Sequence, residues 1–112
     1  HNIVIVGTND EDIYKAFDHL RKIKGGLVAV NKGKVLEDLP LPIAGLISDQ
    51  PYEKVISNIE SLREKVKILG AQHAAPFMIL SFLSLSPIPL LKITDRGLID
   101  VSKFEIVDLF VE

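Results

Sequence analysis

The sequence predicts an α/β fold: a mixed sheet that begins with a βαβ unit, with hairpins and two to three helices. Three observations carry this prediction. Apolar runs at residues 3–6 and 27–30 flank a segment whose apolar residues recur at helical spacing. Two pairs of short apolar runs enclose turn residues, at 31–34 and at 95–97. A longer amphipathic helical segment lies between these two hairpins.

Length and composition restrict the class of protein. A chain of 112 residues has room for one hydrophobic core, so we expect a single α/β domain over residues 1–112. The absence of cysteine from the sequence excludes a disulfide scaffold and a thiolate metal site. A formal net charge of −2 gives no electrostatic basis for binding nucleic acid. The mean hydropathy of +0.28 is high for a small soluble domain, which suggests that part of the surface is covered by something else.

The first predicted strand is the β-branched run at residues 3–6, which is apolar on both faces and therefore reads as a central strand. Thr8 is the predicted N-cap of the next helix, and Glu11 completes a capping box. The helix ends at the glycine pair 25–26. Because a strand, a helix and a strand follow one another, residues 3–6 and 27–30 should pair in parallel. The apolar stripe of this helix is Ile13, Ala16, Phe17, Leu20 and Ile23.

The next segment predicts a hairpin. Residues 31–34 have turn chemistry, with Gly33 able to adopt a positive φ. Residues 35–39 should therefore return antiparallel to residues 27–30. Residues 43–47 are apolar as well, and their pattern leaves a short strand and a buried turn as alternatives.

A second helix is predicted from the start signals Ser48 and Asp49, with Pro51 in its first turn and Gly70 at its end. Its charged residues lie away from one apolar stripe, which is typical of a helix that packs one face on a sheet. The stripe is Val55, Ile59, Leu62, Val66 and Leu69.

Residues 74–91 are the most apolar stretch and carry no charge. Pro76 can open a third helix, and the region from Phe77 to Leu85 leaves it almost no polar face. Three prolines interrupt the stretch, so we expect no membrane-spanning helix. A helix that is apolar all round must be buried all round, and a chain of this length has little material to bury it. We therefore expect a partner to cover Phe77 to Leu85.

The sequence pattern of residues 90–111 predicts a second hairpin and a last strand. Residues 90–94 and 98–101 flank Asp95-Arg96-Gly97, a turn with glycine where positive φ is needed. Residues 104–111 alternate loosely between apolar and polar, which indicates a strand.

The turn at residues 7–10, Gly-Thr-Asn-Asp, is a candidate phosphate site because helix N-termini bind anions. A dinucleotide fingerprint needs three spaced glycines, and only Gly7 is present. Acids at positions 10–12 would also repel a phosphate. A capped helix start is therefore the favoured interpretation.

Histidines and serines are the remaining candidates. His1, His19 and His73 lack the paired spacings of metal ligands, and we expect His19 to be solvated and His73 to lie in a loop. Ser48 and Ser81 lack the Gly-x-Ser-x-Gly elbow of a nucleophile. We expect Ser48 to cap a helix and Ser81 to bond to a carbonyl one turn back. The residues thus predict no self-contained catalytic, cofactor-binding or metal site.

Nine segments, in order along the chain, carry a resemblance to a known family. They are Val-Gly-Thr-Asn-Asp-Glu-Asp at 6–12, Gly-Gly-Leu-Val at 25–28, Gly-Lys-Val-Leu at 33–36, Leu-Pro-Leu-Pro-Ile-Ala-Gly-Leu at 39–46, Ser-Asp at 48–49, Pro-Phe-Met at 76–78, Leu-Ser-Phe-Leu at 80–83, Ile-Pro at 88–89 and Leu-Lys-Ile-Thr-Asp-Arg-Gly-Leu at 91–98. These segments resemble the C-terminal domain of the bacterial and archaeal adenine deaminases. Ala75 departs from the family pattern, which suggests an acidic residue there.

The resemblance implies an enzyme of the amidohydrolase superfamily, in which a metal-bearing barrel uses manganese or iron to hydrolyse adenine to hypoxanthine and ammonia. It implies that the barrel supplies the metal ligands, so this chain is expected to hold no cofactor. His1 and Asn2 match the end of a family segment that contains His and Asp. His1 is therefore the one residue expected near the active site.

We accordingly expect the C-terminal, non-barrel domain of a cytoplasmic, oligomeric hydrolase of purine salvage, inactive by itself. The expected partner of Phe77 to Leu85 is the catalytic barrel or a second copy of this chain, and the full enzyme would bind adenine. A stand-alone purine-binding or protein-interaction module is the alternative. Neither nucleic acid nor a membrane is expected as a partner.

Overall fold

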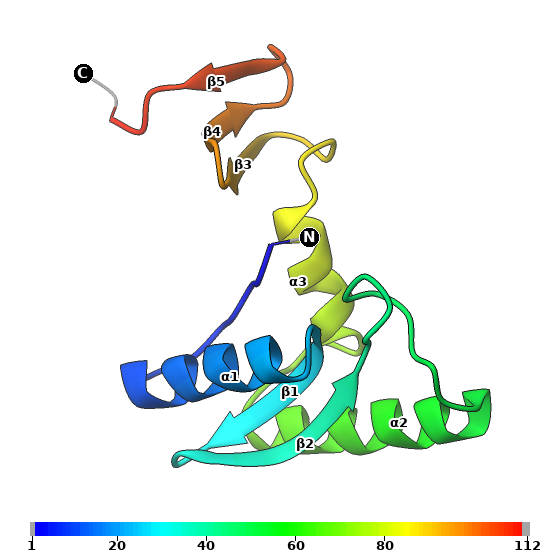
Figure 1. Cartoon of the computed structure of the whole chain (residues 1–112). Helices are drawn as coiled ribbons and strands as arrows, with labels where there is room; N and C mark the ends of the chain where they lie inside the picture. The colour runs from blue at the N-terminus through cyan, green and yellow to red at the C-terminus, as the bar shows by residue number, and fades with distance from the viewer. Residues whose placement is uncertain (1, 111–112) are drawn as a thin grey trace. The chain divides into compact units, whose positions relative to one another are not determined.

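The computed structural model describes residues 2–110, which divide into two compact units. Residues 5–76 form the helix–hairpin unit, and residues 2–4 with 77–110 form the meander unit. The described residues contain three α-helices, one two-stranded sheet and one three-stranded sheet (Figure 1). This composition confirms the predicted α/β class. The prediction of one domain over 1–112 stays a prediction beside this division.

The helix–hairpin unit is a β-hairpin with a helix on each face (Figure 1). His19 of the first helix contacts Asp38 of the second strand, and Ser61 of the second helix donates a hydrogen bond to the neighbouring Glu37. Since successive strand residues point to opposite faces, these two contacts put the helices on opposite faces of the hairpin. The elements are α1 (Asp10–Lys22), β1 (Gly26–Asn31), β2 (Lys34–Pro40) and α2 (Tyr52–Ile68).

Strands β1 and β2 pair antiparallel, with Gly26 opposite Pro40 and Asn31 opposite Lys34. Lys32 and Gly33 both have positive φ, 51° and 71°, which is the backbone of a two-residue hairpin turn. This confirms the predicted hairpin. The core of the unit lies between the hairpin and the two helices, and its buried side chains are Ala16, Leu20, Ala29, Leu39 and Leu62.

The meander unit contains three antiparallel strands in chain order. Helix α3 (Pro76–Ser84) precedes them, as predicted, and its first residue belongs to the other unit. Val101 and Lys92 are buried, and the Lys92 ammonium donates to the carbonyl oxygen of Leu91 at 3.2 Å. The second hairpin and the last strand are confirmed, although the last strand is shorter than predicted. The strands are β3 (Leu91–Thr94), β4 (Gly97–Asp100) and β5 (Glu105–Val107).

The predicted βαβ unit is wrong for the described residues 2–110. Residues 3–6 form no strand, Val6 is 76% exposed, and β1 pairs with β2 alone. Both described sheets are antiparallel, so the sheet is not mixed. The physical reason is that a β-branched run becomes a strand only where a neighbouring strand completes its hydrogen bonds, and no described strand pairs with residues 3–6.

Two predicted helix caps are also wrong. The N-cap of α1 is Asn9, one residue after Thr8, because the Asn9 side chain accepts a hydrogen bond from the backbone amide of Asp12 at 2.9 Å. The N-cap of α2 is Pro51, which makes no side-chain cap, while the Ser48 hydroxyl accepts the amide of Gln50 at 3.1 Å. Polar residues compete for a cap, and backbone geometry decides which one reaches the free amides.

Residues 43–47, left open by the sequence, form a turn closed by an isolated antiparallel bridge between Ile43 and Ile47. Both of these side chains are exposed, so neither alternative, a strand in a sheet or a buried turn, describes the segment fully.

Candidate functional site

Asp12 connects the start of α1 to the hairpin turn. Its carboxylate accepts hydrogen bonds from the Gly33 amide at 2.7 Å, the Lys32 amide at 3.1 Å and the Asn9 side-chain amide at 3.0 Å. The Gly33 amide is the largest cause that lowers the pKa of Asp12 below its ordinary value. The candidate phosphate site at residues 7–10 is thus a capped helix start. This is the interpretation that the acidic residues at positions 10–12 favoured.

Replacing Asp12 with asparagine should lower the melting temperature by a few degrees near pH 7, because all three amide donors lose an ionised acceptor. A lowered folded-state pKa stabilises the fold above the unfolded-state pKa, and this stabilisation disappears as the pH falls through the folded-state pKa. The wild type and Asp12→Asn should therefore converge below about pH 4. Thermal melts across pH 3–7 measure this difference.

Asp10→Asn is the matched control, since Asp10 lies in the same first helical turn, while the described hydrogen bonds from the hairpin turn to α1 go to Asp12. A difference between wild type and Asp12→Asn that stays constant from pH 3 to pH 7 would contradict the proposed role of the ionised carboxylate.

His19 is not the solvated helix residue that the sequence predicted. Its Nε2 lies 2.5 Å from Asp38 Oδ2, and the two side chains are 24% and 30% exposed. His73 is exposed in a loop, as predicted, and His1 lies outside the described residues. Across residues 2–110, no three His, Cys, Asp or Glu side chains come together as a possible metal site.

The serine hydroxyls have structural partners. The Ser81 hydroxyl donates to the Phe77 carbonyl at 3.0 Å, which confirms the predicted bond one turn back, and Ser84 donates to the Ser81 carbonyl. The described hydrogen bonds of Ser48 and Ser81 include none to a histidine. The structure therefore does not bring together the residue types that a nucleophilic site requires.

Two polar contacts that the sequence analysis missed hold the helices on the hairpin. The Ser61 hydroxyl donates to Glu37 Oε2 at 2.5 Å on the α2 side, and His19 meets Asp38 on the α1 side. The sequence signal for these contacts was the adjacent pair Glu37 and Asp38 in a strand covered on both faces. A partly buried carboxylate needs a hydrogen-bond partner, so each of the two predicts a polar contact with the helix on its side. These contacts are structural.

Helix α3 is the apolar surface that the sequence singled out. None of its residues is buried, and the exposed fractions of Met78, Phe82 and Leu83 are 57%, 49% and 55%. Phe77, Ile79 and Leu80 are half-buried, so the helix exposes part of its almost wholly apolar surface. Among residues 2–110, no helix combines the length and apolarity needed to cross a membrane.

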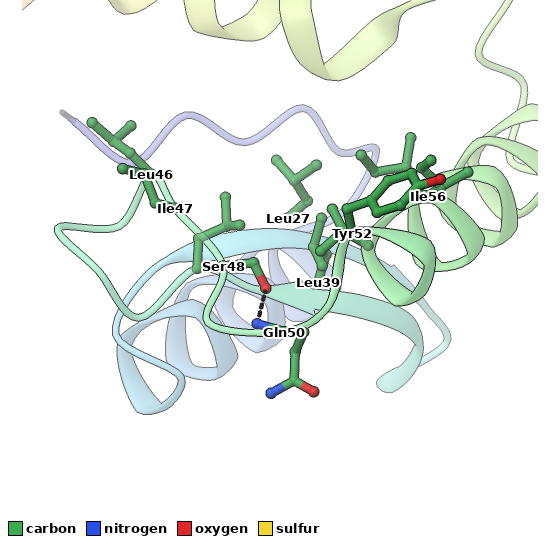
Figure 2. A pocket seen from close by; sticks show the side chains of 11 residues that line it. Leu27, Leu39, Leu46, Ile47, Ser48, Gln50, Tyr52 and Ile56 are labelled. Carbon is green, nitrogen blue, oxygen red and sulfur yellow. Dashed lines mark hydrogen bonds between the residues drawn. The ribbon is translucent and has the colours of Figure 1, made fainter.

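A second apolar surface lies in the helix–hairpin unit and was missed by the sequence analysis (Figure 2). It is a groove of about 490 Å³ between the first half of α2, the hairpin and the segment from residue 41 to residue 50. None of the described residues that line it is charged. The unassigned apolar run at residues 43–47 was the available signal for this groove. The lining residues are Leu27, Leu39, Leu41, Leu46, Ile47, Ser48, Gln50, Tyr52, Val55, Ile56 and Ile59.

The geometry therefore offers two exposed apolar surfaces and, within residues 2–110, no assembled catalytic or metal site. Comparison with known proteins adds that a family model described as the adenine deaminase C-terminal domain matches residues 1–105. The chain belongs to this adenine deaminase C-terminal domain family.

Individual relatives agree with the family match. The chain is 53% identical over 107 residues to the adenine deaminase of Brucella suis, which covers 96% of this chain and 18% of the relative. It is 47% identical over 107 residues to that of Dehalococcoides mccartyi, covering 96% of this chain and 19% of the relative. It is 46% identical over 112 residues to that of Clostridium botulinum, covering 100% and 19%. The adenine deaminase C-terminal domain thus spans less than a fifth of these relatives.

Proposed function

We propose that this chain serves as the C-terminal, non-catalytic domain of an adenine deaminase, an enzyme that converts adenine and water to hypoxanthine and ammonia. The match to relatives named adenine deaminase along nearly the whole chain carries this proposal. In the reaction, the oxygen of water replaces the exocyclic amino group of adenine, which leaves as ammonia. The four-fifths of each relative that lies outside the match would supply the catalytic machinery.

The possible metal ligands among residues 2–110 support a catalytic metal site in another domain of the enzyme. A manganese or iron site needs several carboxylate or imidazole ligands around one point, and residues 2–110 provide no such group. The described residues therefore do not fit the metal, which we propose is held by the catalytic domain. His1, which lies outside them, stays a prediction as a residue near the active site, and so do the cytoplasmic location and the oligomeric state.

The contact with the catalytic domain is proposed to run through Phe77 to Leu85. Helix α3 carries no charge, and its exposed Met78 and Phe82 lie at positions i and i+4 on one side of the helix, next to the exposed Leu83. Burying such a side against another apolar surface is favourable at about 25 cal/mol per Å². Support for this partner comes from the length of the relatives, since the match leaves most of each relative available as cover.

The test is ammonia release from adenine. The 112-residue chain, checked for folding by circular dichroism, should release none with or without added manganese. A chimera in which this chain replaces the matched region of the Brucella suis adenine deaminase should release ammonia.

Turnover of adenine by the 112-residue chain would overturn the proposal. The alternative function, a stand-alone purine-binding module, is tested with the same sample by calorimetric titration with adenine and hypoxanthine. Heat of binding to the isolated chain would favour that alternative, and its absence at millimolar purine would count against it.

A further inference from the structure

We propose that the groove of the helix–hairpin unit is a second docking surface, and that its occupant is an uncharged aliphatic segment from the larger part of the same adenine deaminase polypeptide. This inference rests on the proposed function for the identity of the partner. The groove is a site distinct from α3, and the proposed function gives it no role.

The outer wall of the groove is fixed by backbone contacts. The Leu41 amide donates to the Gly25 carbonyl at 3.0 Å, and the Ile43 and Ile47 amides each donate to the carbonyl of the other at 3.2 Å and 3.1 Å. A Cβ added at Gly25 would lie 2.6 Å from the Cα of Gly45, so the two backbones meet with no room for a side chain. The wall is therefore formed before any partner arrives.

This fixed wall holds aliphatic side chains in solvent. Leu46 is 54% exposed and Ile47 is 59% exposed, while Ala44 next to them has a φ of 56°, which is strained for an L residue. A strained backbone that presents apolar side chains to water gives the isolated unit no stability. It does lower the entropy cost of binding, because the contact residues are already in place.

The chemistry of the groove determines the class of occupant. Eight of its eleven lining residues are aliphatic and three are polar. The Ser48 hydroxyl is already bonded to the Gln50 amide, and the Gln50 side chain points away from the aliphatic residues (Figure 2). With no charge in the lining, a phosphate or a charged peptide would lose its hydration without a counter-charge. An uncharged aliphatic segment matches the surface.

The size of the groove favours a segment of the same polypeptide over a second copy. Eleven residues line it, whereas a stable complex of two separate proteins uses roughly 20–30 residues on each side. A partner on the same polypeptide can bind through fewer contact residues, because a tethered partner acts at an effective concentration of about millimolar. The relatives are about five times as long as the match, so most of each polypeptide is available to supply a tethered partner.

Single cysteines test the groove, because the sequence of this chain has none of its own. Ile47→Cys reports on the groove, Met78→Cys reports on α3, and Ile68→Cys is the matched control, since Ile68 is 79% exposed and lies outside both surfaces. Each variant is labelled with a maleimide in the 112-residue chain and in the Brucella suis chimera, and labelled peptides are quantified by mass spectrometry.

All three thiols should react rapidly in the 112-residue chain. In the chimera, the thiol of Ile47→Cys should react at least about tenfold more slowly than that of Ile68→Cys, because labelling then requires opening of the docked state. Slow reaction of both Ile47→Cys and Met78→Cys supports both docking surfaces. Slow reaction of Ile47→Cys alone supports the groove and overturns the contact proposed for α3.

Three results would overturn the inference. If Met78→Cys is protected in the chimera and Ile47→Cys is not, the groove proposal fails while the proposed function stands. If neither is protected, both docking surfaces fail, and ammonia release by the chimera then decides separately whether the proposed function stands. If Ile47→Cys becomes protected in the 112-residue chain as its concentration rises, with a doubled mass by light scattering, the occupant is a second copy.

Discussion

Leu62→Ala should lower the free energy of unfolding of the helix–hairpin unit by about 2–5 kcal/mol. Leu62 is the largest side chain that is fully enclosed, with 0% exposure, and it lies on the face of α2 that packs on the hairpin. The loss combines the burial free energy of the three deleted carbons with the cost of the cavity that they leave, since the surrounding structure relaxes only in part. In a domain stabilised by about 5–15 kcal/mol, this change removes a large share of the total.

Urea unfolding followed by tyrosine fluorescence and circular dichroism measures this change. Tyr14 and Tyr52, the two tyrosines of the chain, both lie in the helix–hairpin unit, so their signal reports on that unit. Ile68→Ala on the exposed side of the same helix is the matched control and should change the free energy by no more than about 0.5 kcal/mol. Equal losses in the two variants would show that the buried face of α2 does not hold the unit together.

Gly26→Ala should destabilise the same unit through its backbone. Gly26 begins β1 with a φ of 143°, and a Cβ at this position would lie 2.2 Å from the carbonyl oxygen of Leu39. Because Leu39 is itself buried and is paired with Leu27 of β1, neither partner can move without loss of the hairpin register. We expect backbone strain of about 1–2 kcal/mol and a further ~1–3 kcal/mol from the forced displacement.

Gly70→Ala separates these two contributions. Gly70 ends α2 with a φ of 103°, and a Cβ there meets nothing within 4 Å, so only the backbone strain of about 1–2 kcal/mol applies. Gly26→Ala should therefore be clearly the more destabilising of the two in the same urea experiment. If the two variants lose the same free energy, the close approach to Leu39 is not what requires glycine at position 26.

The elements that the sequence predicted correctly are those whose signals are local. The hairpin around Lys32 and Gly33 follows from turn residues that accept positive φ, and α2 follows from apolar residues spaced by three and four with Gly70 at the end. The second hairpin has the same kind of signal at Gly97. In each case a few neighbouring residues fix the backbone, so distant parts of the chain are not needed to predict it.

The predictions that failed depended on partners. Residues 3–6 have the composition of a buried central strand, yet strand formation requires a neighbouring strand, and the described residues 2–110 offer them none. Thr8 and Asn9 can both cap a helix, and only the path of the backbone decides between them. His19 has no local signal for its contact with Asp38, which comes from an element 19 positions away.

The candidate surfaces show the same division. Helix α3 was predicted as an apolar surface that needs a partner to cover it, because its side chains alone reveal that almost no face is polar. The groove was not predicted, since its eleven lining residues come from the hairpin, α2 and the segment between them, each of which looks like an ordinary core element.

By itself, the sequence determined the α/β class, the positions of the hairpins and helices, the resemblance to the adenine deaminase C-terminal domain and the apolar character of α3. These properties follow from residue type and spacing, which act over a few positions of the chain. The tertiary structure alone decided that residues 3–6 stay unpaired, that Asp12 and His19 tie α1 to the hairpin, and that Leu46 and Ile47 stand exposed beside a groove. The physical reason is that strand pairing, burial and exposure depend on contacts between segments that are distant in the sequence. These contacts exist only in the folded chain.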